Sequence, residues 1–114
     1  MTRAERVSEH TIQSSWNVAA GASATASLAC VPTWYENFRK DLTRVDVPTL
    51  VIHGDADRIL PIAATGIRTH KAVKGARLVV VEGGPHGLTW THAELVNREL
   101  VDFLGQRKSA GVEA

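Results

Sequence analysis

Two short apolar runs in the second half of the sequence are separated by a segment of mixed apolar and polar positions. The runs cover residues 49–53 (Thr-Leu-Val-Ile-His) and 77–82, are rich in β-branched residues and end at glycines. Such runs are typical of strands that are buried on both faces, as in parallel sheets. Between them, residues 62–74 begin after Pro61 and end before Gly75, which predicts a helix with a left-handed residue at its end. The pattern therefore predicts a β-α-β unit and the α/β class.

Helices are predicted on both sides of this unit. Thr91 and Glu94 have capping-box spacing, and the apolar positions that follow predict a helix over residues 91–104 that Gly105 ends. Earlier in the chain, Thr33 and Glu36 have the same spacing and predict a helix through about residue 43. The Ala/Ser-rich residues 14–30 predict one or two short helices, and the polar residues 106–114 are expected to be a frayed tail.

Composition and charge narrow the possible functions. The 114 residues are 44% apolar and 22% charged, with a formal net charge of +1, which fits one folded domain and disfavours nucleic acid or an anionic membrane as a partner. No apolar run approaches the roughly 20 residues of a membrane-spanning helix. The first six residues lack the apolar core of a secretory signal, so we expect a cytoplasmic protein. Cys30 is the one cysteine, which excludes an internal disulfide, and its apolar neighbours predict a buried side chain.

Two turns place titratable residues just after the predicted strands. Asp57 lies in the turn after the first strand, and His86 lies in the Gly-Gly-Pro-His-Gly turn after the second. Open α/β sheets have their active sites at this end of the strands. If the strands are neighbours, about 4.8 Å apart, Asp57 can bind His86, fix its tautomer and stabilise its protonated form. That is the relation of the Asp and His in a Ser-His-Asp triad.

Less specific interpretations of these residues remain open. Asp57 can equally form an Asx turn or a helix N-cap before Pro61, and Asp55 fits the role of a turn residue. His86 is difficult to explain as a core histidine because its Pro-His-Gly turn should be exposed. His53 precedes Gly54 at the end of the first predicted strand, while His10, His70 and His92 fall in predicted helical contexts with no partner at metal-ligand spacing, and a zinc site needs three or four convergent ligands. We therefore expect no metal site and no cofactor-binding residues.

The sequence resembles the C-terminal part of bacterial non-haem haloperoxidases, cofactor-free chloroperoxidases and bromoperoxidases also called perhydrolases, in the α/β-hydrolase superfamily. The resemblance covers most of the chain from Ser15 to Gly105. It rests on Trp16-Asn17, Pro32-Thr33-Trp34-Tyr35, His53-Gly54-Asp55-Ala56-Asp57-Arg58 with Leu60-Pro61, and Pro85-His86-Gly87-Leu88 with Trp90-Thr91-His92.

The resemblance implies a fold and an activity for the intact family. It implies a Ser nucleophile, an Asp matching Asp57 and a His matching His86, which hydrolyse small esters and form a peracid from acetate and hydrogen peroxide without haem or metal. Residues 14–43 would then be cap-derived and return helices, and residues 48–105 a C-terminal β-α-β-α unit, within a single partial domain over residues 1–114. Tryptophans such as Trp34 would line a pocket under the cap or, more commonly, pack in the interior.

The sequence departs from the family pattern at the nucleophile. The family has a G-x-S-x-G turn between a strand and a helix, with the oxyanion hole beside it. The nearest match here is Gly21-Ala22-Ser23-Ala24-Thr25, which lacks the second glycine and follows no predicted strand. We therefore expect that Ser23 is not a nucleophile and that the chain is inactive alone.

Two hypotheses follow for function and partners. The chain is either part of a perhydrolase-type enzyme that needs a Ser-bearing segment, or a self-associating structural module with vestigial triad residues. Two strands alone leave sheet edges unpaired, and such edges recruit other chains. The expected partner is therefore a second copy, forming a homo-oligomer, or the missing N-terminal hydrolase segment.

Overall fold

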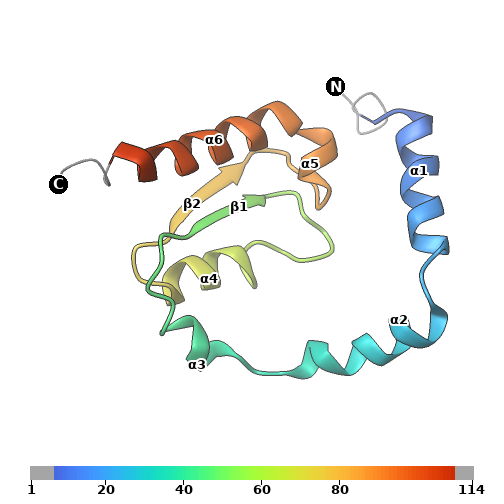
Figure 1. Ribbon diagram of the computed structural model, residues 1–114, viewed down its shortest axis with the longest axis horizontal. Helices are drawn as coiled ribbons and strands as arrows, with labels where there is room; N and C mark the ends of the chain where they lie inside the picture. Colours follow the sequence, from blue (N-terminus) through green and yellow to red (C-terminus); the bar gives the residue numbers. More distant parts are fainter. Residues whose placement is uncertain (1–6, 110–114) are drawn as a thin grey trace. The chain divides into compact units, whose positions relative to one another are not determined.

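The computed structural model of the protein describes residues 7–109. The chain divides into two compact units, Met1–Lys40 and Asp41–Ala114. The first unit is helical, and the second contains the sheet and the residues predicted to carry chemistry (Figure 1).

The first unit contains α1 (Glu9–Ala20), α2 (Ala24–Cys30) and a 3₁₀ helix, η2 (Val31–Tyr35). Ser8 and Ser23 are the N-caps of α1 and α2, and each side-chain oxygen accepts a hydrogen bond from a backbone N–H three residues later. Residues 21–23 separate the two helices, with Gly21 as the C-cap of α1. The prediction of two short helices in this Ala/Ser-rich region is confirmed, although α1 begins five residues before residue 14.

The helix predicted over residues 33–43 is wrong. Residues 31–35 form η2, Glu36 is extended, and only α3 (Arg39–Leu42) is α-helical in this range. The Thr33 hydroxyl donates to the carbonyl of Cys30 at 2.6 Å, three residues back. It therefore does not cap a helix that starts after it, because a hydroxyl used in this way stabilises the preceding turn instead.

The second unit is built on two parallel strands, β1 (Leu50–Gly54) and β2 (Arg77–Val81), paired in register from Leu50 opposite Arg77 to Gly54 opposite Val81. Helix α4 (Gly66–Ala72) connects them, and α5 (Leu88–Thr91) and α6 (Ala93–Ser109) follow β2. Figure 1 shows α4 on one side of the sheet and α6 on the other. The predicted β-α-β-α order is confirmed.

The core of this unit lies between β2, α5 and α6. Val81, Leu88 and Val96 are its buried members, and Ile52 and Leu95 pack against them. Arg77 at the start of β2 bonds Glu99 of α6 at 3.0 Å and lies over the Phe103 ring at 5.9 Å. These contacts hold α6 along the sheet near the start of β2. The loops lie at the opposite end, where β1 and β2 finish.

Three predicted helix boundaries differ from the structure. The helix predicted over residues 62–74 begins only at Gly66, because residues 61–65 form tight turns in which Pro61 and Ile62 carbonyls accept backbone bonds. Gly75 is left-handed as predicted, with φ of +75°. Thr91 is not an N-cap: it ends α5, and its hydroxyl donates to the carbonyl of Gly87. Gly105 does not end α6, which continues to Ser109, so the tail expected from residue 106 is helical to that point; residues 110–114 lie outside the described residues.

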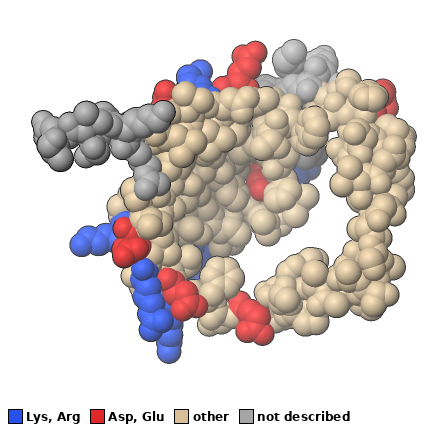
Figure 2. Space-filling view, in the orientation of Figure 1, with Lys and Arg blue, Asp and Glu red and all other residues tan. Residues whose placement is uncertain are grey.

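The first unit exposes much of its apolar surface. Within residues 7–40 no residue is buried, Cys30 is exposed, and Trp34 is 78% exposed. The predictions of a buried Cys30 and of a packed Trp34 are therefore wrong, because short helices in this unit have no second layer to pack on. Residues 7–38 contain no Lys or Arg, and Figure 2 shows this segment almost wholly uncharged. No helix in the described part of the chain is long and apolar enough to cross a membrane.

Candidate active site

The loops after β1 and β2 lie side by side at the same end of the two parallel strands. Three hydrogen bonds donated by backbone N–H groups join them: Asp55 N–H to the Val81 carbonyl, Ala56 N–H to the Gly84 carbonyl, and Gly83 N–H to Asp55 Oδ1 at 2.7 Å. The geometric premise of the sequence analysis, adjacent parallel strands with their turns together, is therefore confirmed. Asp55 does more than turn the chain, because its side chain holds the second loop against the first.

Asp57 is buried, with 8% of the residue exposed. Its Oδ1 accepts hydrogen bonds from the backbone N–H groups of Ile59 and Leu60, each at 2.9 Å. This is the Asx-turn arrangement that the sequence left open. It orients the carboxylate and leaves the other oxygen for a different partner.

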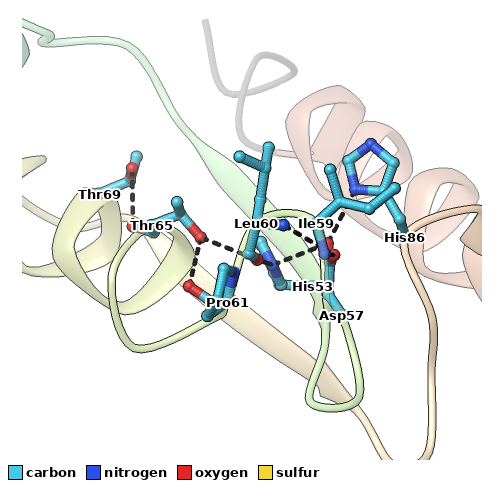
Figure 3. Close-up of polar contacts among 8 residues, drawn as sticks. All are labelled: His53, Asp57, Ile59, Leu60, Pro61, Thr65, Thr69 and His86. Atoms are coloured by element: carbon cyan, nitrogen blue, oxygen red, sulfur yellow. Dashed lines mark hydrogen bonds and ion pairs between the residues drawn. The ribbon is translucent and has the colours of Figure 1, made fainter.

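The second oxygen of Asp57 bonds His86. The distance from Asp57 Oδ2 to His86 Nδ1 is 2.9 Å, while the His86 side chain is 48% exposed. In Figure 3 the other ring nitrogen, Nε2, points away from Asp57. The Asx-turn and triad interpretations of Asp57 are therefore compatible, because Oδ1 forms the turn and Oδ2 bonds His86.

The surroundings of Asp57 favour its ionised form. Burial alone, the largest influence, would raise the pKa of the carboxyl group. The Leu60 N–H, the hydrogen bond from His86, the Ile59 N–H and the charge of His86 act against it, and together they lower the pKa of Asp57 from 3.8 to about 2. At neutral pH Asp57 is an anion that binds the Nδ1–H of His86, fixes its tautomer and leaves Nε2 able to accept a proton.

Sequence reasoning missed a third member of this cluster, His53. Its Nε2 lies 2.9 Å from the carbonyl oxygen of Leu60 and 3.3 Å from Asp57 Oδ2, and its side chain is 14% exposed. The sequence analysis placed His53 at the end of a strand but gave it no role. A useful signal was a polar residue at the end of an otherwise apolar strand, four residues before the predicted carboxylate.

Ser23 lies in the other unit and serves as the N-cap of α2, accepting from the N–H of Ala26 at 3.3 Å. Among residues 7–109 no strand precedes it, so it is not on a strand-to-helix turn. Within the same described range, no three His, Cys, Asp or Glu side chains are grouped as ligands for a metal ion.

Comparison with known proteins agrees with this architecture. Residues 2–93 match the family described as the alpha/beta hydrolase fold. The chain belongs to the α/β-hydrolase fold family. Within that family it is similar to the non-haem haloperoxidases: a protein of Synechocystis sp., named as a non-heme chloroperoxidase, is 58% identical over 100 residues, which are 88% of this chain and 36% of that protein.

Two further α/β-hydrolases are likewise similar to most of this chain over about a third of their own length. The non-heme chloroperoxidase CPO-A1 of Kitasatospora aureofaciens is 37% identical over 94 residues, covering 80% of this chain and 34% of that one. The crystal structure of bromoperoxidase from Bacillus anthracis superposes with a TM-score of 0.84 at 41% identity, covering 90% of this chain and 38% of the other. This chain thus spans about a third of the length of these relatives, and it is a partial α/β-hydrolase domain.

Proposed function

We propose that this chain supplies the Asp and His of a Ser-His-Asp site that hydrolyses small esters and, with hydrogen peroxide, forms peracids. The observation that carries the proposal is the 2.9 Å contact between the buried carboxylate of Asp57 and Nδ1 of the half-exposed His86. A buried anion behind an accessible imidazole is the arrangement that general-base catalysis requires. The similarity to haloperoxidases supports the substrate class.

In the proposed reaction His86 Nε2 accepts the proton of a Ser hydroxyl as that oxygen attacks the ester carbonyl. Asp57 remains ionised, because its pKa is about 2, and stabilises the imidazolium that forms. His86 then returns the proton to the leaving alcohol, and an acyl-serine remains. Water cleaves the acyl-serine to an acid, and hydrogen peroxide cleaves it to a peracid; in both cases His86 takes one proton from the attacking molecule and returns it to the Ser oxygen.

The proposal assigns the Ser and the oxyanion-hole donors to a hydrolase segment other than residues 7–109. Ser23 does not fit the role, because its hydroxyl caps α2 and lies on no strand-to-helix turn. The shared length supports the same assignment, since about two-thirds of the Synechocystis relative has no counterpart here.

The open sheet is the surface where we propose that this segment binds. Each described strand has a single paired edge, the one between β1 and β2. Val80 is 50% exposed on the sheet and Leu60 is 47% exposed in the loop beside Asp57. An added strand would pair the backbone groups of one open edge and cover apolar surface of this kind. We therefore propose that the occupant is the Ser-bearing segment rather than a second copy of this chain.

Complementation tests the proposal. The full chain is co-expressed with the portion of the Synechocystis relative that has no counterpart in this chain, and hydrolysis of p-nitrophenyl acetate and labelling by a fluorophosphonate probe are measured. We expect no labelling of the chain alone, a labelled and active complex, and a loss of about 10⁶-fold in kcat for His86→Gln. His10→Gln, at an exposed site on α1, is the matched control and should leave the rate unchanged.

Three results would contradict the proposal. Labelling of the isolated chain would point to a nucleophile within it, and equal activity of the His86→Gln complex would remove His86 from the reaction. A homo-oligomer in light scattering that binds no Ser-bearing segment would favour the structural module with vestigial triad residues.

A further inference from the structure

His53 is the residue of the site that the triad does not use. It is the fourth residue of β1, on the face of the sheet toward α4, and its ring lies against Gly66 at the start of that helix. A Cβ atom on Gly66 would lie only 2.8 Å from His53 Nδ1 and 3.0 Å from Cγ. The site therefore requires glycine at position 66 for the ring to occupy its present position.

The hydrogen bonds of His53 determine which nitrogen carries its proton. The carbonyl oxygen of Leu60 can only accept, so Nε2 of His53, 2.9 Å away, must be the donor. The same N–H faces Asp57 Oδ2 at 3.3 Å, which is also an acceptor. Both contacts are thus met by the same Nε2–H group of His53.

These contacts close a ring of bonds around the Asp57 carboxylate (Figure 3). The N–H of Leu60 donates to Asp57 Oδ1, and the carbonyl of Leu60 accepts from His53. His53 in turn contacts Oδ2, the oxygen that His86 also binds. A carboxylate held through both oxygens cannot rotate without breaking a bond on each side.

We propose that His53 is a positioning residue that aims Asp57 Oδ2 at His86. It acts through Asp57 and through the loop of residues 57–60, and makes no contact of its own with the reacting atoms. The purpose of this positioning rests on the proposed function. Its direct effect, the Nδ1–H tautomer of His86, can be measured in the chain without any hydrolysis.

Two substitutions of His53 separate a donor from a packing residue. His53→Gln keeps an N–H near the position of Nε2 and loses the ring, whereas His53→Phe keeps the ring and loses the N–H. The readout is the tautomer of His86 from ¹⁵N chemical shifts of the labelled full chain at about pH 8.5, two units above the ordinary pKa of histidine. Asp57→Asn is the positive control for loss of the tautomer, and His10→Gln is the negative control.

We expect the wild-type chain and His53→Gln to hold His86 as the Nδ1–H tautomer, and His53→Phe to give a mixture of both. Gly66→Ala keeps the imidazole but displaces it, so it should resemble His53→Phe; it also provides the measurement if His53→Phe does not fold. If His53→Phe kept the single tautomer and His53→Gln lost it, His53 would act through the packing of its ring and not through its N–H group. A single tautomer in all four of these proteins would remove any role for His53, and would leave the complementation result unaffected.

Discussion

Gly54 and Gly84 approach so closely that a Cβ on Gly54 would lie 2.0 Å from the carbonyl oxygen of Gly84. Both residues are buried: Gly54 is the last residue of β1, and Gly84 lies in the loop after β2, two residues before His86. The loops can touch because neither glycine has a side chain between them. The distance between the catalytic candidates is therefore set by backbone contact as well as by their own hydrogen bond.

The first prediction concerns this contact. Gly54→Ala should destabilise the fold by about 3 kcal/mol, because a backbone carbonyl cannot move aside as a flexible side chain could. Urea unfolding at 25 °C measures the change, and an unchanged slope with urea concentration would show that compactness is preserved. A loss below about 0.5 kcal/mol would mean that the two loops are further apart than described.

The second prediction uses a glycine with the opposite environment. Gly105 is exposed inside α6 and a Cβ there would meet no atom within 4 Å. Gly105→Ala should therefore stabilise the protein by about 0.5–1 kcal/mol, the usual cost of glycine in a helix interior. The same urea measurement checks it. A loss of stability would indicate that Gly105 ends the helix, as its sequence position first predicted.

The strands were predictable from sequence because apolar β-branched runs favour strands, but the expectation that both faces would be buried is wrong, since most residues of β1 and β2 are only partly buried. Residues 49–53 differ from β1 by one residue at each end, and residues 77–82 differ from β2 by one residue at the C-terminal end. The helix ends were less predictable, because Thr33 and Thr91 had capping-box spacing but their hydroxyls bond carbonyls of preceding turns. Spacing identifies a residue that can cap, and only the path of the chain decides which backbone group its hydroxyl meets.

The site was partly predictable for a similar reason. Asp57 and His86 follow the two strands, so parallel pairing brings them together. The role of His53 depends on how the loop after β1 folds back on that strand, over a separation of 7 residues. The role of Asp55 depends on how the two loops fold against each other, over a separation of 28 residues. No periodicity in the sequence specifies such contacts.

The third prediction tests the bond between those loops. Asp55→Ala removes the acceptor for Gly83 N–H and should destabilise the fold by about 1 kcal/mol. Asp55→Asn keeps a side-chain oxygen at the same position and should retain most of that stability. If both variants lose the same amount in urea unfolding, the negative charge of Asp55 matters rather than its hydrogen bond.

The fourth prediction follows from the lowered pKa of Asp57. Its pKa is about 2 in the folded chain and 3.8 as the ordinary value, so the folded state binds fewer protons between those two values. Stability from Asp57 is therefore complete above about pH 4 and is lost as the pH falls toward 2. The free energy of unfolding of the wild-type chain should decrease across this range more steeply than that of Asp57→Asn, which has no proton to take up.

Urea unfolding at a series of pH values from 6 to 2 measures both slopes. Asp102→Asn removes an exposed carboxylate of α6 and serves as the matched control; it should keep the steep wild-type slope. If Asp57→Asn also keeps that slope, the acid sensitivity belongs to other carboxylates. The buried Asp57 would then not be the anion that the bond to His86 requires. An ionised carboxylate held by the N–H groups of Ile59 and Leu60 and by two histidines must lower the free energy of unfolding when it is protonated.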